Sequence, residues 1–414
     1  MPPAFLILIF LLPYLAATAF EHFLSWCNDR HQVRPETLPP VFRDTLDAMS
    51  LSRMRDYARD RNRFSILHRI TTDVVLVSAL MTGLLQALDL RLHGLHPVIA
   101  GLLFFGFIGL ASFLIGLPFD WSHAFIIEKR HGFSTKTPLT WILDQVKGLA
   151  LSLLLGTALL SGILAIWFWA GSLNWFFAFL LVMGFQLLMI FAYPLWVAPL
   201  FNTFTPLAEG PLRQSILELC QRTGLDVKDI LVMDASRRTA HTNAYMAGLG
   251  RSRRIVFYDS LLQKHPPEEI IAILAHEIGH WKFRHLPKQI FFFGSAAFLL
   301  FWLAGKLMDW PLLYTAFGFA YPQAHTGFFL LALLWTPAGL LLSPLSCALS
   351  RRAEYKADAF AKKACGSGKA LQSALKRMAK DNLSNVSPHP LYVLFHYTHP
   401  PLAERIAALE DRGC

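Results

Sequence analysis

Hydrophobic positions in this chain gather into long runs, and segments rich in charged residues separate them. A helix that crosses a bilayer needs about 20 mostly apolar residues. Seven runs meet that need: 4–20, 70–90, 97–118, 148–170, 173–200, 289–308 and 326–349. The pattern predicts a mainly α-helical, polytopic membrane protein with seven transmembrane helices.

The first run contains Ala17-Thr18-Ala19, which resembles the cleavage site of a secretory signal peptide. No Lys or Arg precedes the run, however, so the charged segment that begins a signal peptide is missing. We therefore expect a retained first helix. Run 70–90 is the weakest of the seven, because Asp73 and Arg69 lie at its edge.

Basic residues follow the alternate connections between the runs. Segments 21–66, 119–147, 201–288 and 350–414 are rich in Lys and Arg, whereas 91–96 holds Arg91 alone and 171–172 and 309–325 hold none. Cytoplasmic loops of membrane proteins carry such an excess of positive charge. The distribution predicts an N-terminus on the outer or lumenal side and a C-terminus in the cytoplasm, in a bacterial inner membrane or the endoplasmic reticulum.

Two of the polar segments are long enough to fold outside the lipid, on the same side. They give four expected parts: helices 1–5 with basic loops in 1–200, a first globular part in 201–288, helices 6–7 in 289–349, and a second globular part in 350–414. Residues 230–236 and 253–262 are short β-branched runs flanked by turn residues, which predict a small sheet or hairpin.

Composition narrows the class of protein. Hydrophobic residues make up 54% of the chain and charged residues 16%, against about 25% charged in a typical soluble domain. A simple soluble protein and a disordered chain are excluded. The net charge of +10 suits anionic lipid headgroups better than nucleic acid. The five cysteines are scattered without a C-x-x-C pair, which argues against a disulfide framework or a cysteine zinc site.

The clearest chemical motif is His-Glu-Ile-Gly-His at 276–280. Pro266-Pro267-Glu268-Glu269 predicts the start of the helix that carries it, because proline and acidic residues suit a first helical turn. His276 and His280 then share one helix face and can hold one zinc ion, with Glu277 beside them as the base for the attacking water. Gly279 predicts a close approach by another element.

A catalytic zinc needs a third protein ligand. His285 falls one position away from the extended His-containing motif, and we expect it to be a surface histidine. Glu354 and Asp358, four residues apart on an expected helix, fit better: Glu354 as the ligand and Asp358 as a hydrogen-bond acceptor for a ligand histidine. The alternative for this pair is a solvated acidic helix face.

These residues stand in a pattern that resembles the CAAX prenyl endopeptidase family. The resemblance extends along most of the chain, and Ser134 departs from it where the family commonly has Asn. The matching segments are Ser52-Arg53 with 57–60, Glu128–Phe133, 198–202, 204–207, His241–Tyr245, 254–256, the H-E-x-x-H motif, Glu354 with Asp358, and His399-Pro400-Pro401 with Arg405.

The resemblance implies seven transmembrane helices that form a water-filled chamber, capped by a small gluzincin-type zinc metallopeptidase domain with a minor β element. It implies one Zn²⁺ per chain, held by His276, His280 and Glu354, with Glu277 as the general base. It also implies that Asn243 and Tyr245 hold the substrate backbone, and that His399 and Arg405 stabilise the oxyanion and brace the site. His399 is expected before a turn, and Arg405 on a following helix from Leu402 to Leu409.

Three interpretations stay open at this stage. A membrane zinc endopeptidase is favoured, acting on peptide or protein substrates that are either prenylated CAAX proteins or a wider set of membrane proteins in quality control. A site-2-type intramembrane protease would bury the motif in an apolar span, whereas charged residues bracket it here. A seven-helix transporter or receptor with a structural zinc leaves Glu277 without a role. The sequence does not fix the oligomeric state.

Overall fold

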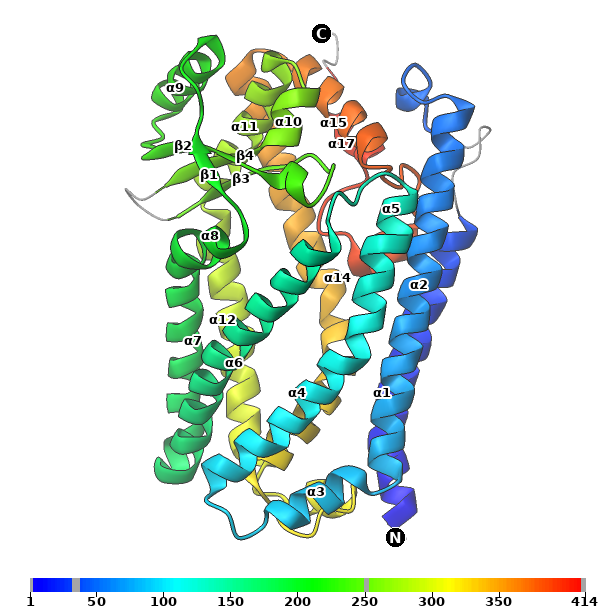
Figure 1. Ribbon diagram of the computed structural model, residues 1–414, viewed down its shortest axis with the longest axis vertical. Helices are drawn as coiled ribbons and strands as arrows, with labels where there is room; N and C mark the ends of the chain where they lie inside the picture. The colour runs from blue at the N-terminus through cyan, green and yellow to red at the C-terminus, as the bar shows by residue number, and fades with distance from the viewer. Residues whose placement is uncertain (1–2, 32–37, 249–252, 411–414) are drawn as a thin grey trace.

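The computed structural model describes residues 3–31, 38–248 and 253–410, and for residues 3–10 the backbone alone. Long helices run along the molecule, and a cap of shorter helices and strands lies at one end (Figure 1). The long helices are α1 (Pro3–Arg30), α2 (Ala48–Met81), α4 (Pro97–Ser122), α6 (Pro138–Trp169), α7 (Asn174–Ala192), α12 (His285–Leu307) and α14 (Ala324–Cys365).

The long helices close into a ring. Each contacts the next in the order α1, α2, α4, α6, α7, α12, α14, and α14 contacts α1 again. Within the described residues, six helices rather than the expected seven are long and apolar enough to cross a membrane. The expected span 4–20 falls in α1, but part of its side chains lies outside the described residues, so this span is not among the six.

Run 70–90 does not form one span, which corrects the prediction. The spanning helix there is α2, which begins at Ala48 and includes the arginine-rich segment before the run. Gly83 follows α2 with a left-handed backbone (φ 77°), and the rest of the run forms a separate short helix, α3 (Leu84–Leu92). Thr82, Gly83 and Leu84 bring no charge into the run, so hydropathy alone does not reveal this break.

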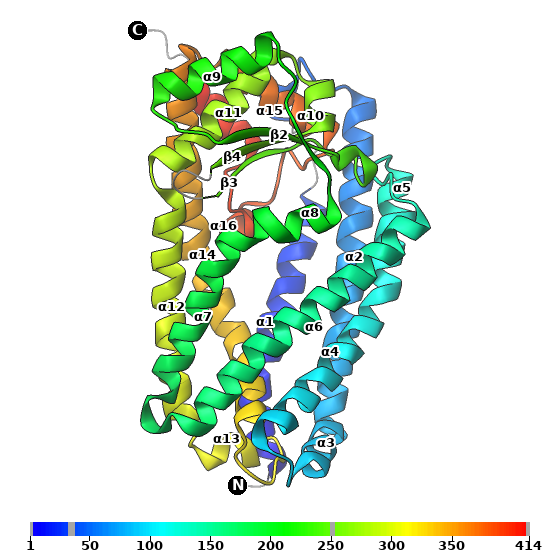
Figure 2. The same cartoon turned by 60° about the vertical axis from the view of Figure 1, so that its left-hand side comes forward.

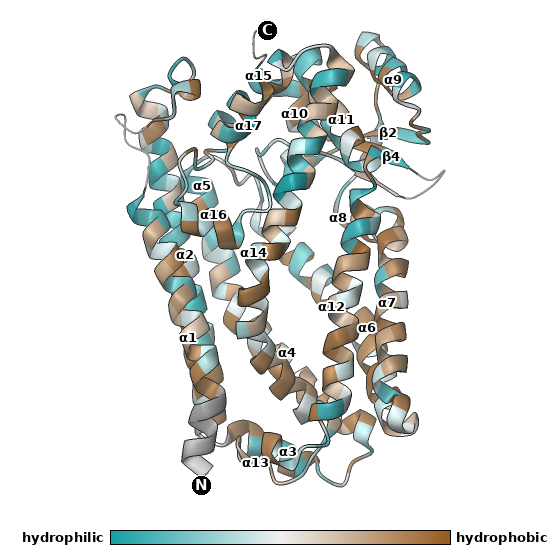
Figure 3. Ribbon diagram, turned by 180° about the vertical axis from the view of Figure 1, so that it is seen from behind, coloured by the Kyte–Doolittle hydropathy of each residue, from teal (hydrophilic) through white to brown (hydrophobic). Residues whose placement is uncertain are grey.

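The other five predicted runs each lie in one of the six spanning helices. Their side chains face outward to a large extent: Phe291 and Leu341 are each 78% exposed. Figure 3 shows the hydrophobic colouring concentrated along the long helices, with hydrophilic residues more frequent in the cap. Exposed apolar side chains on a ring of long helices are expected where lipid, rather than water, covers the surface.

The cap holds a small mixed sheet and most of the short helices. The strands are β1 (Phe204–Pro206), β2 (Asp229–Met233), β3 (Ala244–Ala247) and β4 (Arg254–Tyr258), in the spatial order β1-β2-β4-β3. β2 and β4, the two runs expected from sequence, pair in parallel, so they form a sheet and not a hairpin. β3 is antiparallel to β4 and lies at the edge of the sheet.

Five helices complete the cap, and short turns link the long helices. The cap helices are α9 (Pro211–Thr223), α10 (Asp259–Lys264), α11 (Pro267–Lys282), α15 (Lys369–Asp381) and α17 (Leu402–Leu409). The shorter elements elsewhere are η2 (Pro40–Phe42), η3 (His123–Ile127), α5 (Glu128–Arg130), η4 (Gly171–Leu173), η5 (Tyr193–Val197), α8 (Ala198–Phe201), η6 (Ala235–Arg237), α13 (Pro311–Thr315) and α16 (Pro390–His396).

The apolar face of α11 forms the centre of the cap core. Ile270, Leu274 and Ile278 are at most 1% exposed and pack with buried residues of α9, β4 and α15. In Figure 2 the sheet lies between these helices and the ring of long helices. α14 passes from the ring into the cap, so one continuous helix joins the membrane part to the core that positions the site.

Candidate metal centre

The H-E-x-x-H motif lies in the C-terminal half of α11, which begins at Pro267 as the proline pair predicts. Gly279 allows α14 to cross α11 closely: a Cβ there would lie 2.9 Å from the Cα of Ala357. The close approach that Gly279 predicts is therefore confirmed. It brings the face of α14 that carries Glu354 and Asp358 against the two motif histidines.

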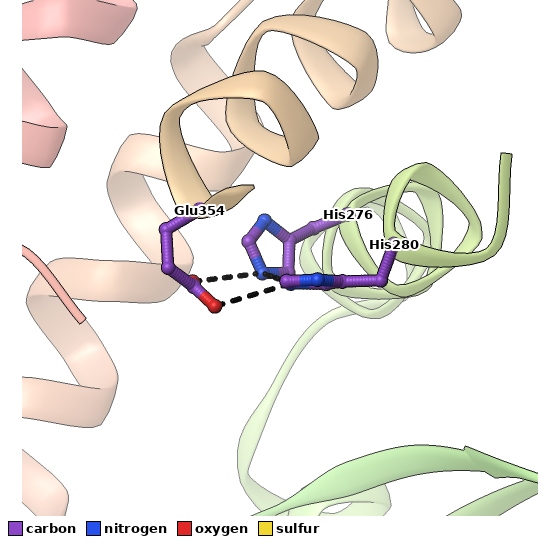
Figure 4. Close-up of side chains that lie close together, drawn as sticks. All are labelled: His276, His280 and Glu354. Atoms are coloured by element: carbon purple, nitrogen blue, oxygen red, sulfur yellow. Dashed lines mark hydrogen bonds and ion pairs between the residues drawn. The ribbon is translucent and has the colours of Figure 1, made fainter. Parts of the chain in front are cut away.

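Three side chains converge at this crossing. His276 and His280 from α11 point toward Glu354 from α14 (Figure 4). The two Nε2 atoms are 3.1 Å apart. The Glu354 carboxylate lies 3.4 Å from His276 Nε2 and 3.2 Å from His280 Nε2. One nitrogen or oxygen atom from each residue lies within 4.8 Å of the others.

The protonation pattern of this cluster favours a bound cation. Asp358 lies 2.8 Å from His276 Nδ1 and, as a carboxylate, can only accept, so in the neutral imidazole Nδ1 carries the proton and Nε2 presents a lone pair. That lone pair faces the negative Glu354, whose buried Oε2 accepts no hydrogen bond from the described residues. Two nitrogens and one carboxylate oxygen, with Asp358 behind one histidine, suit zinc.

Without a metal, a proton is the cation that this cluster attracts. Burial by itself lowers the pKa of His276, but the neighbouring carboxylates of Asp358 and Glu354 reverse the shift and raise the pKa to about 9. A divalent cation held by these residues would displace that proton. The residues present therefore fit a metal ion.

His285 is buried (7% exposed), so the expectation of a surface histidine is wrong. α11 ends after Lys282, and Arg284 adopts a left-handed conformation (φ 53°) that turns the chain back. As a result, His285 Nδ1 lies 2.8 Å from His280 Nδ1. This contact orients His280, as Asp358 orients His276. The sequence spacing gives no sign of it, because it depends on the turn at Arg284.

Arg405 lies on α17, behind the cluster of His276, His280 and Glu354. This helix spans Leu402–Leu409, as expected from the sequence. The Arg405 guanidinium donates two hydrogen bonds to Asp358, from Nε to Oδ2 at 2.8 Å and from Nη2 to Oδ1 at 2.7 Å. Its Nη1 lies 3.6 Å from Glu354. Arg405 is 6% exposed, so it fixes the carboxylate that orients His276.

Glu277 and His399 face a cavity of about 450 Å³ beside the cluster, and Asn243, His276 and Arg405 also line it. Burial raises the pKa of the Glu277 carboxyl above its usual value. The His399 side chain is 61% exposed, and its Nε2 lies 3.3 Å from Glu354. A carboxyl group that can accept a proton and an imidazole that can donate one thus border the same cavity.

Tyr245 is not brought to this cavity, although Asn243 is. The Tyr245 side chain packs with Met233 and Val256 in a separate small cluster, and it is absent from the described lining of the cavity. The contact with substrate that the resemblance implies for Tyr245 stays a prediction. In the structure, Tyr245 pairs with Val256 of β4.

Comparisons with known proteins place the chain in a family. Residues 29–203 match the family model of the CAAX prenyl protease N-terminal region with five membrane helices, and residues 206–413 match peptidase family M48. CAAX prenyl protease 1 of Saccharomyces cerevisiae is 35% identical over 96% of this chain and 93% of its own length. The Homo sapiens homologue is 30% identical over 94% of this chain and 92% of its own length.

A solved structure agrees with these matches over nearly the whole chain. The crystal structure of S. mikatae Ste24p covers 99% of both chains, with a TM-score of 0.88 and 31% sequence identity. The resemblance found in the sequence is confirmed, and the transporter and site-2 alternatives are set aside. This chain belongs to peptidase family M48 and is a multi-pass membrane zinc metalloendopeptidase.

Proposed function

We propose that His276, His280 and Glu354 hold one zinc ion per chain. The observation that carries this proposal is the convergence of two Nε2 atoms and one carboxylate within 4.8 Å. Bound there, zinc would lower the pKa of a water molecule and polarise the scissile carbonyl. Asp358 and His285 hold the two imidazoles by their Nδ1 atoms, so that each Nε2 stays directed at the ion.

Glu277 is the general base in this proposal. Its carboxylate borders the cavity next to His276 and takes the proton of the attacking water. Burial raises its pKa, which brings its proton affinity closer to what a base needs near neutral pH. The protonated Glu277 then delivers that proton to the nitrogen of the leaving amine.

His399 and Arg405 have different parts in this mechanism. His399 is exposed to the cavity and free to donate to the oxyanion that forms on the scissile carbonyl. Arg405 is a positioning residue, because two of its nitrogens already bind Asp358. Asn243 directly precedes the edge strand β3 at the cavity wall, where an extended substrate backbone can pair.

The proposed substrates are prenylated proteins that end in a CAAX sequence. The support is the printed name of the relatives, CAAX prenyl protease 1, together with their match to almost the full chain. We further propose an orientation with the site and the C-terminus on the cytoplasmic side, supported by the lysines and arginines of 119–147, 201–288 and 350–414.

The four-part division is also a proposal: helices in 1–200 and 289–349, with peptidase parts in 201–288 and 350–414. The junction between the two family matches, at residues 203–206, supports its first boundary.

The substrate proposal is tested with purified protein, a farnesylated CAAX peptide and its unprenylated form. Cleavage of the farnesylated peptide before its last three residues is expected. Equal cleavage of both forms at unrelated bonds would contradict a CAAX substrate.

A further inference from the structure

A second, larger cavity adjoins the one at the metal centre. It has a volume of about 850 Å³, and α2, η3 and the segment 382–397 contribute to its walls. The two cavities share five lining residues, so they meet along a common wall: Asn243, Asn382, Ser384, Asn385 and Tyr397. The proposed mechanism uses the first cavity and leaves the second without a role.

The polarity of β3 directs one end of a bound peptide toward this second cavity. β3 is an edge strand that runs from Ala244 to Ala247 and is already antiparallel to β4. The Asn243 carbonyl accepts a hydrogen bond from the backbone N–H of Tyr258. Because hydrogen-bonding groups alternate between the two sides of a strand, the N–H and C=O of Ala244 point to the open edge of the sheet. A peptide that pairs antiparallel with β3 at this edge would have its C-terminal end near Asn243.

Arg61 supplies a positive charge in the second cavity. The described lining contains two arginines, Arg61 and Arg69, against one acidic residue, Asp120. Arg69 is paired with Glu21 at 3.1 Å. Arg61 makes no ion pair with any carboxylate of the described residues. Of the two arginines in this lining, Arg61 is therefore the one whose charge no described carboxylate neutralises, and an anionic ligand in this cavity would bind there.

A chain of contacts connects Arg61 to the start of β3. The guanidinium lies 5.2 Å from the ring centroid of Tyr57, and the Tyr57 hydroxyl donates to Glu128 at 2.7 Å. His241, two residues before Asn243, lies 3.3 Å from the other Glu128 oxygen. These contacts hold the cation at a set position relative to the strand on which the peptide is proposed to lie.

We infer that Arg61 binds the free C-terminal carboxylate of the substrate, after the residues beyond the scissile bond have passed Asn243 into the second cavity. The inference rests on the proposed endopeptidase function and deepens it. It assigns recognition of the free C-terminus to one side chain, Arg61, which the proposed mechanism does not use. An arginine recognises a carboxylate through paired, charge-assisted hydrogen bonds.

The test compares three farnesylated CAAX peptides that differ at the C-terminus alone: a free acid, a carboxamide, and a form extended by glycines. Cleavage by the zinc-loaded enzyme is followed by mass spectrometry. A hydrogen bond to a charged group contributes about 1.5–3 kcal/mol, so kcat/KM for the free acid should exceed that for the amide by about 10- to 100-fold. In Arg61→Gln this ratio should fall to about one, and Arg61→Lys should retain part of it.

Arg63→Gln is the matched control, because Arg63 is exposed on the same helix and absent from the described lining of both cavities. It should keep the full preference, and all variants should keep the wild-type melting temperature. An unchanged preference in Arg61→Gln, or equal cleavage of acid and amide by the wild type, would overturn the inference and leave the proposed function intact. Failure to cleave any of the peptides would overturn the proposed function and the inference with it.

Discussion

Gly279 and Ala357 lie in contact where α11 and α14 cross, and this contact sets the separation of the two helices that carry the proposed zinc ligands. A Cβ on Gly279 would approach the Cα of Ala357 to 2.9 Å and its carbonyl oxygen to 3.2 Å. Both are less than ordinary van der Waals distances to backbone atoms, which cannot rotate away as a side chain can.

Gly279→Ala should therefore push α14 from α11 and separate Glu354 from the two histidines. Overpacking of this kind typically costs about 1–3 kcal/mol. We expect a lower melting temperature and less than one zinc per chain after dialysis. Gly184→Ala in α7 is the control, because a Cβ there meets no heavy atom within 4 Å. Full zinc occupancy in Gly279→Ala would show that the crossing tolerates the extra carbon.

Glu277→Ala should retain zinc and lose activity, because the three proposed ligands are unchanged and the base is removed. Loss of a general base typically costs about 10²–10⁴ in rate. Zinc per chain and peptide cleavage are measured on the same preparation. Loss of both would make Glu277 structural, and retained cleavage would exclude it from the mechanism.

His399→Ala should lower kcat by about 10²–10³, the usual cost of a lost oxyanion donor, with little change in KM or in zinc content. The exposed position of its side chain makes a folding defect an unexpected outcome. Near-normal kcat would mean that His399 contacts the site without acting in the reaction.

Arg405→Lys should weaken zinc binding rather than catalysis by the loaded enzyme. One ammonium group cannot replace the two guanidinium nitrogens that bind both oxygens of Asp358. His285→Ala should also weaken zinc binding, because it removes the contact that orients His280. Loss of a residue that orients a metal-ligating histidine typically costs about 10- to 100-fold in affinity, which competition with a chelator measures. Unchanged affinity in both variants would contradict these positioning roles.

Protonation of Glu269 at low pH should weaken the contact between α11 and α15. Burial raises the pKa of Glu269, but hydrogen bonds from Arg377, Ser373 and His265 outweigh burial and hold the pKa below its ordinary value. A carboxyl with a lowered folded-state pKa stabilises the protein above its unfolded pKa, and this stability is lost as the pH falls through the folded pKa. The melting-temperature difference between wild type and Glu269→Gln should therefore shrink as the pH falls below the ordinary pKa of a glutamate. A constant difference would show that the charge of Glu269 does not contribute.

The proposed zinc ligands and the crossing of α11 and α14 could be predicted from the sequence, because both depend on the spacing of residues along a helix. The turn of helix between His276 and His280, and between Glu354 and Asp358, places each pair on one face, and Gly279 marks the crossing. The contacts missed by sequence reasoning depend on the turning of the chain. The left-handed Arg284 brings His285 to His280, and Gly83 divides the apolar run 70–90 into α2 and α3. The roles of Asn243, His399 and Arg405 came from resemblance, since no local pattern marks them.

The zinc content and the peptidase activity of one purified preparation together test whether His276, His280 and Glu354 hold a catalytic zinc ion. We predict one zinc per chain and cleavage of a farnesylated CAAX peptide that stops on addition of a chelator and returns with zinc. We also predict loss of both zinc and cleavage in the double variant His276→Ala with Glu354→Ala. Full cleavage by a protein shown to contain no metal, or full zinc occupancy after both ligands are removed, would contradict this assignment.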